Sequence, residues 1–197
     1  MTRSGCATGS GRIDGVPGGY RLRVQSQSTI TQKQQESGQQ EENTRDRLAR
    51  EVSELARRHG VTIAVAESLT GGMVASALAA AEAASEWFRG SLVAYSSEVK
   101  HEVLDVPDGP VVSAEAAAAM ARGVRRLLGA DVAVAVTGAG GPDPQDGQDP
   151  GTVYVGVDDG ADGRVHELDL DGDPEEIIVQ AADGTLGELL DALHARR

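Results

Sequence analysis

Three short segments of this chain combine nucleophilic or basic side chains with turn-forming residues, and each directly follows an apolar stretch. They are ESLTGG (residues 67–72), YSSEVK (residues 95–100) and TGAGGP (residues 137–142). Hydroxyl groups and amines can act as nucleophiles and general bases, and successive backbone N–H groups can hold a phosphate or a developing oxyanion. The three segments are therefore the candidate catalytic and binding turns of the protein.

The first turn joins a predicted buried strand, which ends near Glu67, to a predicted helix. Ser68 supplies a hydroxyl group at this junction. The backbone N–H groups near Thr70, Gly71 and Gly72 lie where a helix starts, a place that favours anions and developing oxyanions. The structural alternative is that the hydroxyl residues only cap the helix while the glycines make the turn.

The second turn carries Tyr95, Ser96 and Lys100. Lysines and arginines together number 18, and only Lys33 and Lys100 are lysines. Because an amine can lose its proton when it is desolvated and a guanidinium cannot, Lys100 is a candidate for proton transfer. The alternative is an ordinary solvated surface lysine.

The third turn, from Thr137 to Pro142, follows a strongly apolar segment. Successive glycine N–H groups, here at Gly138, Gly140 and Gly141, can form an anion-binding nest. The turn is not a dinucleotide fingerprint, because Pro142 follows instead of a helix. A plain connector between two strands is the alternative.

Composition excludes several function classes. The chain has 31 acidic and 18 basic residues and a formal net charge of -13, the wrong sign for binding nucleic acid or an anionic membrane surface. A single cysteine and four histidines without ligand spacing predict no metal site, and we expect no cofactor. The aspartates at 143, 146 and 149 do not have EF-hand spacing and are interpreted as a solvated acidic loop.

The order of predicted elements favours one layered α/β domain over residues 44–197, preceded by a disordered polar leader over residues 1–43. Apolar runs predict strands over 61–66, 91–95, 131–136, 152–158 and 164–170. Helical patterns cover about 45–59, 73–84, 97–104, 115–129 and the segment after Asp173, where Gly184 and Gly187 predict an interruption. No apolar run is long enough to span a bilayer, so we expect a cytoplasmic protein.

Five segments together resemble successive blocks of the CinA C-terminal domain family. They are AESLTGG (66–72), FRGSLVAYSSEVK (88–100), VVSAEAAAAMARG (111–123), ADVAVAVTGAGGP (130–142) and GTVYVGV (151–157). The resemblance covers about residues 45–194 in the family's order and spacing. It implies a three-layer α/β/α sandwich and a homo-oligomer, most simply a dimer. The larger N-terminal domain of full-length CinA is not expected, because only a polar leader precedes residue 45.

The family includes stand-alone deamidases, so the resemblance implies hydrolysis of nicotinamide mononucleotide to nicotinic acid mononucleotide and ammonia. It assigns catalytic roles to Ser68, Tyr95 and Lys100. Ser68 would attack the carboxamide, Lys100 would take its proton, and Tyr95 would orient Lys100 or relay a proton. The remaining turn residues would bind the oxyanion and the 5′-phosphate in either arrangement: Glu67, Thr70, Gly71, Gly72, Ser96, Thr137, Gly138, Gly140, Gly141 and Thr152.

The sequence also departs from the family pattern. Leu69 stands where cysteine is common, Ser97 stands where asparagine is common, and the third turn has an extra glycine. Residues 172–180 (GDPEEIIVQ) lack two arginines that the family typically has there. Two alternatives therefore stay open: a catalytically silent nucleotide-binding domain and an amidase for another carboxamide.

Overall fold

The computed structural model describes residues 43–196 of the chain. The predicted leader, residues 1–43, lies outside this part except for Asn43. The elements are α2 (Thr44–His59), β1 (Ile63–Glu67), α3 (Met73–Ala80), α4 (Ala84–Trp87), β2 (Phe88–Val93), α5 (Ser97–Leu104), α6 (Ala114–Leu128), β3 (Val132–Gly138), β4 (Thr152–Asp158), β5 (Gly163–Asp169) and α7 (Pro174–Ala195).

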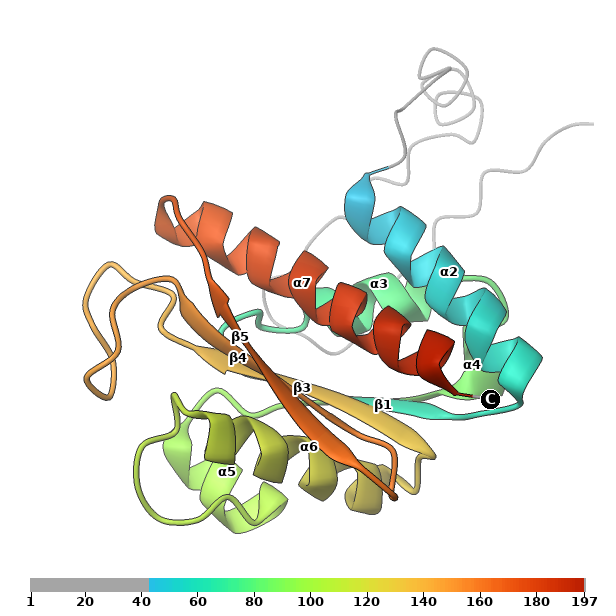
Figure 1. Ribbon diagram of the computed structural model, residues 1–197, viewed down its shortest axis with the longest axis horizontal. Helices are drawn as coiled ribbons and strands as arrows, with labels where there is room; N and C mark the ends of the chain where they lie inside the picture. The colour runs from blue at the N-terminus through green and yellow to red at the C-terminus, as the bar shows by residue number, and fades with distance from the viewer. Residues whose placement is uncertain (1–42, 197) are drawn as a thin grey trace, which may run out of the picture. The chain divides into compact units, whose positions relative to one another are not determined.

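The strands form one mixed five-stranded sheet in the order β2-β1-β3-β4-β5. Strands β2, β1 and β3 run parallel, whereas β4 and β5 are added antiparallel. Figure 1 shows α2, α3 and α7 on one side of the sheet and α5 and α6 on the other. The α/β architecture predicted from the sequence is confirmed, as a three-layer sandwich.

The two faces of the sheet are packed with side chains of different size. In β1, Ile63 and Val65 belong to the core beneath α2, α3 and α7, while Ala64 and Ala66 belong to the core beneath α6. This alternation follows from the two-residue period of a strand. Small alanines let α6 approach the sheet closely, and a Cβ at Gly156 of β4 would clash with the α6 backbone.

Local signals in the sequence explain most helix ends. Asn43 accepts a hydrogen bond from the N–H of Arg45 at the start of α2, and Gly60 ends that helix in the left-handed conformation. Asp173 forms a capping box with Glu176 at the start of α7. These residue types satisfy backbone groups that a helix leaves without partners.

Three predicted elements differ in the structure. The helix predicted over 73–84 ends at Ala80, because Ala81 is extended, and the short helix α4 starts after the left-handed Ala83. Strand β2 begins at Phe88 rather than 91. Helix α7 runs without interruption for 22 residues. A Cβ at Gly184 would lie 2.8 Å from Leu168, so this glycine permits close packing against β5 instead of breaking the helix.

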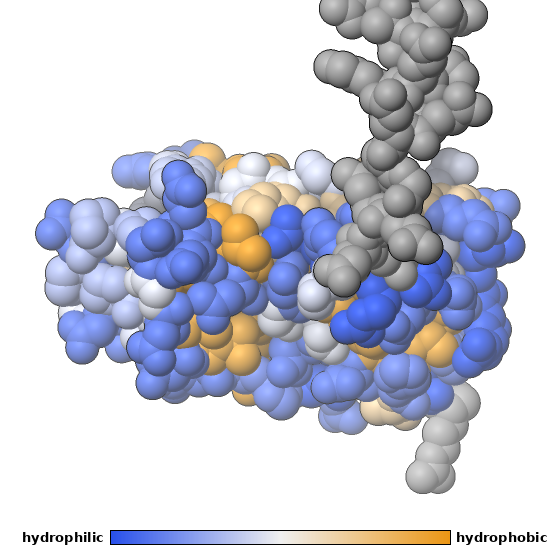
Figure 2. All heavy atoms as spheres, turned by 90° about the horizontal axis from the view of Figure 1, so that it is seen from above, coloured by the Kyte–Doolittle hydropathy of each residue, from blue (hydrophilic) through white to orange (hydrophobic). Residues whose placement is uncertain are grey.

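The surface above α2 and α7 is mainly hydrophilic, with apolar residues in separate smaller patches (Figure 2). This distribution agrees with the strongly acidic composition. Within residues 43–196, no helix has the length and apolar character needed to cross a membrane.

Candidate active site

The first two candidate turns lie side by side at one edge of the sheet. Strands β1, β2 and β3 are parallel, and Glu67 at the end of β1 pairs with Val93 of β2 and Val136 of β3. The ladder continues one residue further, since the N–H of Ser68 donates to the carbonyl oxygen of Val136 and the N–H of Ala94 donates to that of Glu67. Ligands gather at such carboxyl ends of parallel strands.

Strand alternation places the functional side chains on a common face. Ser68 continues the series of alanines in β1 that pack against α6, and Thr137 continues the corresponding alanines of β3. Helix α5 covers the same face, with Leu104 in the same core. Ser68, Thr137 and Lys100 therefore belong to one layer of the molecule, and Ser68 keeps 8% of its surface exposed.

Lys100 is the most unusual side chain of this layer. It is 1% exposed, and its Nζ donates a hydrogen bond of 3.2 Å to the carbonyl oxygen of Tyr95. Burial lowers the pKa of this ammonium, and the Asp146 carboxylate acts in the opposite direction. The interpretation as a solvated surface lysine is therefore wrong. A buried amine with a lowered pKa suits proton transfer.

The two other candidate residues of this turn, Tyr95 and Ser96, have different structural roles. Tyr95 touches Lys100 through its main-chain oxygen, while the residue as a whole is 74% exposed. Ser96 is the N-cap of α5, and its Oγ accepts from the N–H of Val99 at 3.4 Å. The structure thus shows Lys100 bonded to the main-chain oxygen of Tyr95, while the orienting role of Tyr95 and the substrate contact of Ser96 stay predictions.

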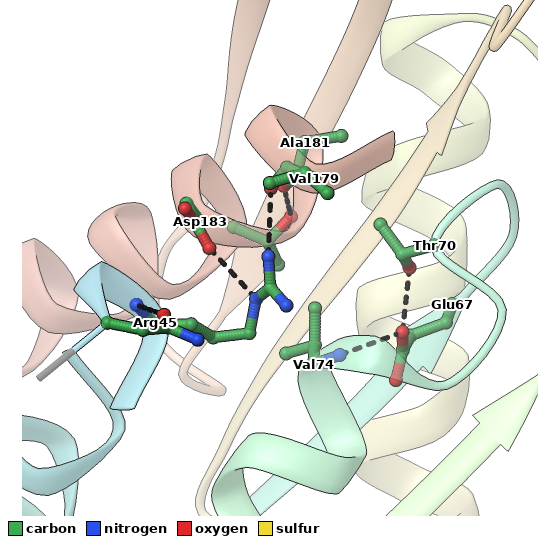
Figure 3. Close-up of polar contacts among 9 residues, drawn as sticks. Arg45, Glu67, Thr70, Val74, Val179, Ala181 and Asp183 are labelled. Atoms are coloured by element: carbon green, nitrogen blue, oxygen red, sulfur yellow. Dashed lines mark hydrogen bonds and ion pairs between the residues drawn. The ribbon is translucent and has the colours of Figure 1, made fainter. Parts of the chain in front are cut away.

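The carboxylate of Glu67 saturates the first turn of α3. It is fully buried and accepts the Thr70 hydroxyl at 2.7 Å and the N–H groups of Gly72, Val74 and Ala75 at 3.0, 3.2 and 2.8 Å. Figure 3 shows the Glu67 side chain directed at Thr70 and the start of the helix. This carboxylate neutralises the positive end of α3 from within.

This arrangement changes the expectation for the glycine pair. The N–H of Gly72 is bound to Glu67, and the N–H of Gly71 donates to the carbonyl oxygen of Ser68 at 3.1 Å. These two groups are therefore not free donors for an oxyanion or a phosphate in this structure. The physical reason is that a buried carboxylate needs internal donors and takes the nearest ones. Substrate binding by Glu67 and Thr70 stays a prediction.

The third turn approaches the first, although its polar groups are largely bound internally. The Thr137 hydroxyl donates to the Val111 carbonyl oxygen at 2.7 Å, and a Cβ at Gly138 would lie 2.7 Å from Val153. A Cβ at Gly140 would lie 3.8 Å from Leu69 of the first turn. Binding roles for Gly138, Gly140 and Thr137 stay predictions.

Two further predicted binding residues lie at the far side of the same loop. A Cβ at Gly141 would lie 3.2 Å from Pro150 and 3.6 Å from Pro174, at the start of α7. Thr152 begins β4, and its carbonyl oxygen accepts the N–H of Ala139 at 2.9 Å. The backbone of Thr152 therefore shapes the turn, while a substrate contact of its side chain stays a prediction.

Asp146 is the residue that the sequence interpretation missed. Its Oδ2 accepts the N–H groups of Val111 and Val112 at 2.7 and 2.9 Å, so this member of the acidic cluster is not merely solvated. The signal was present as Gln145-Asp-Gly-Gln148, because Asp-Gly is typical of a tight two-residue hairpin. Composition alone had pointed to a structureless acidic loop.

A cavity of about 410 Å³ lies on the opposite side of the first turn, between the start of α2 and α3. Gly71 and Gly72 line it, whereas Ser68, Tyr95 and Lys100 do not. Beside it, Arg45 of α2 donates to Asp183 and to the Val179 carbonyl oxygen of α7 (Figure 3). We keep Ser68 and Lys100 as the candidate site, because none of the three predicted catalytic residues lines this cavity.

Comparisons with known proteins agree with this architecture. A model of the CinA C-terminal domain matches residues 45–193. A competence-damage inducible protein of Bacillus velezensis is 39% identical over 140 residues, covering 68% of this chain and 34% of the relative. A CinA-like protein of Frankia casuarinae is 42% identical over 142 residues, covering 69% of this chain and 33% of the relative.

The chain thus spans about a third of the length of the curated relatives it matches. The crystal structure of the competence damage-inducible protein A from Klebsiella pneumoniae superposes with a TM-score of 0.75 at 30% identity, covering 79% of this chain and 100% of that one. The strand order, the five sequence blocks and these matches lead to one conclusion: the chain belongs to the CinA C-terminal domain family.

Proposed function

We propose that this protein is an amidohydrolase that converts nicotinamide mononucleotide to nicotinic acid mononucleotide and ammonia. The observation that carries the proposal is Lys100: a fully buried amine with a lowered pKa, in the same layer as Ser68, which is 8% exposed at the end of a parallel strand. Burying a lysine costs the fold desolvation energy, and ionisable groups of this kind cluster at functional sites. The choice of nicotinamide mononucleotide rests on the resemblance to the family's deamidases.

In the proposed mechanism, Ser68 Oγ attacks the carboxamide carbon while neutral Lys100 takes the hydroxyl proton. The resulting tetrahedral intermediate expels ammonia, which leaves with a proton returned by Lys100. Water then hydrolyses the acyl-enzyme by the same route and releases the carboxylate. Tyr95 orients Lys100 through its carbonyl oxygen; a proton relay through the phenol is the alternative role.

No hydrogen bond joins Ser68 Oγ to Lys100 Nζ in the described residues, where the lysine is bonded to the Tyr95 oxygen. Catalytic hydrogen bonds are often long in a free enzyme and shorten when the substrate binds. The proposal therefore requires Nζ to reach the Ser68 hydroxyl in the substrate complex. The oxyanion then needs donors other than Gly71 and Gly72, and Gly140 lies close to this turn.

The test is release of ammonia and nicotinic acid mononucleotide by purified protein, in low and high salt, beside the variants Ser68→Ala and Lys100→Ala. We expect both variants to lose at least about a thousandfold in kcat, within the range that general base and nucleophile contribute. Arg58→Ala removes one positive charge from the exposed end of α2 and serves as the matched control. A folded wild type without turnover under any of these conditions would refute the proposal.

The second candidate function is nucleotide binding without catalysis. It is favoured by the start of α7, where the family's arginines are absent and Pro174, Glu175 and Glu176 stand instead. This helix start is closed by its own capping box and adds negative charge, so a bound nucleotide would be held by other residues and any catalytic contribution of the missing arginines would be lost. Tight binding of nicotinamide mononucleotide without product formation would identify this function. Turnover of a different carboxamide would identify a related amidase.

A further inference from the structure

The loop between β3 and β4 ends in a tight hairpin rather than in an irregular tip. Gln145 and Gln148 exchange two backbone hydrogen bonds of 3.0 and 2.9 Å. Asp146 and Gly147 between them have φ values of 53° and 80°. Positive φ at both central residues is the type I′ geometry that Asp-Gly favours. The position of Asp146 is therefore fixed by its own turn, although the residue lies at the surface.

The Asp146 carboxylate connects this hairpin to the end of β3. Its Oδ2 accepts the N–H groups of Val111 and Val112, both buried, at 2.7 and 2.9 Å. The carbonyl oxygen of Val111 in turn accepts the hydroxyl of Thr137. Hairpin, segment 111–112 and strand end thus form one hydrogen-bonded unit along the edge that carries Ser68.

The same carboxylate places a negative charge within electrostatic reach of Lys100. Burial disfavours the Lys100 ammonium, and among the described residues Asp146 is the charged group that opposes this effect. Lys100 Nζ has the Tyr95 carbonyl oxygen as its acceptor, so the aspartate acts on it through space. Asp146 is therefore held in place by two backbone donors, and its negative charge favours the Lys100 ammonium.

We propose that Asp146 is a positioning residue of the candidate active site, clamping the β3–β4 hairpin to residues 111–112 and, through the hydrogen bond from Thr137 to Val111, to the end of β3. In assigning Lys100 as the base, this inference rests on the proposed function. The clamp and the counter-charge, however, are properties of the fold and are measurable without substrate.

Two variants separate the clamp from the charge. Asp146→Asn removes the charge but keeps an acceptor oxygen and tolerates the left-handed backbone. Asp146→Gly removes both charge and acceptor and tolerates positive φ without strain. Asp143→Asn makes the same change of net charge at an exposed position of the same loop and is the matched control.

The clamp is measured by hydrogen exchange of the Val111 and Val112 amides at fixed pH. We expect both amides to stay protected in Asp146→Asn and in Asp143→Asn, and to lose at least about tenfold protection in Asp146→Gly, because the acceptor is gone. Unchanged protection in Asp146→Gly would overturn the clamp.

The counter-charge is measured by NMR titration of isotopically labelled lysine. The chain has only two lysines, so the Lys100 signal is assigned with a Lys33→Arg variant. Because an opposite charge favours the ammonium, we expect Asp146→Asn to lower the Lys100 titration midpoint by roughly 0.5 to 1 pH unit. A midpoint equal to that of Asp143→Asn would overturn the counter-charge.

Kinetics then link the residue to the proposed reaction. A base must be neutral, so the acidic limb of kcat/KM should move to lower pH in Asp146→Asn, together with the NMR midpoint. Asp146→Gly should lose about tenfold or more in kcat, since misplaced groups are costly. An inactive wild type would refute the proposed function and leave the exchange and titration results to decide the role of Asp146.

Discussion

The first and second candidate turns occupy equivalent places in the fold, yet they treat their charged groups in opposite ways. Each follows a parallel strand and opens a helix, and each buries one ionisable side chain. Within residues 43–196, Glu67 has four donors around its carboxylate, whereas Lys100 has one acceptor for an amine that can donate three hydrogen bonds.

This difference indicates that the Glu67 carboxylate stabilises the fold, whereas the Lys100 amine is available for proton transfer. A carboxylate that saturates a helix start is held in place by every group it touches, and its loss disrupts the backbone. An amine with one carbonyl partner is destabilised as a cation and gains little from its surroundings. Substitutions at four residues, ordered from the largest expected effect to the smallest, test this contrast.

Lys100→Met should lose at least about a thousandfold in deamidase turnover while unfolding with the same or a higher free energy. The change replaces a desolvated amine by an apolar chain of similar length. Turnover is followed by ammonia release and stability by urea titration. A variant that is strongly destabilised would show that Lys100 serves the fold, as Glu67 does.

The lowered pKa of Lys100 also predicts the direction in which the free energy of unfolding changes with pH. A folded-state pKa below the ordinary lysine value of 10.5 means that the unfolded chain binds more protons. The free energy of unfolding of the wild type should therefore rise, relative to Lys100→Met, as the pH increases toward 10.5. A difference between the two proteins that falls over this range would contradict the lowered pKa.

Glu67→Ala should destabilise the protein by about 3 kcal/mol, because it leaves buried backbone donors of α3 without an acceptor. Glu67→Gln keeps one acceptor oxygen and should be less harmful. Urea unfolding with a constant m-value measures both variants. A loss of less than about 1 kcal/mol in the alanine variant would show that Glu67 is not needed to stabilise the start of α3.

Thr137→Val should cost about 1 to 2 kcal/mol, since it removes the hydrogen bond to the buried Val111 carbonyl oxygen while conserving shape. Thermal unfolding is a sufficient measurement. The KM for the substrate serves as a second readout. A raised KM with unchanged stability would instead assign the Thr137 hydroxyl to ligand binding, as the sequence interpretation had it.

Tyr95→Phe should change the unfolding free energy by less than about 0.5 kcal/mol, because most of the residue is exposed. Turnover should stay within about threefold, since Lys100 is bonded to the main-chain oxygen, which the variant keeps. A much larger fall in kcat with intact stability would assign the phenol to the proton relay.

Much of the candidate site followed from local sequence patterns. Strand ends, turn glycines and the rarity of lysine singled out Ser68, Tyr95 and Lys100, and the parallel strands β1 and β2 end side by side just before Ser68 and Tyr95. Local patterns failed where long-range packing decides. Gly184 was expected to break α7, but this helix is held by its buried face and needs a small residue against Leu168.

The sequence by itself determined the α/β architecture, the family and the residue types at the three turns, because periodicity, caps and glycines are local properties of the chain. Only the tertiary structure decided how those residues are used. It placed the α3 amides on Glu67, buried the Lys100 amine, and brought the Asp146 carboxylate to residues 35 and 34 positions away in the chain. Burial and partner choice depend on which distant segments meet, and no local pattern encodes that.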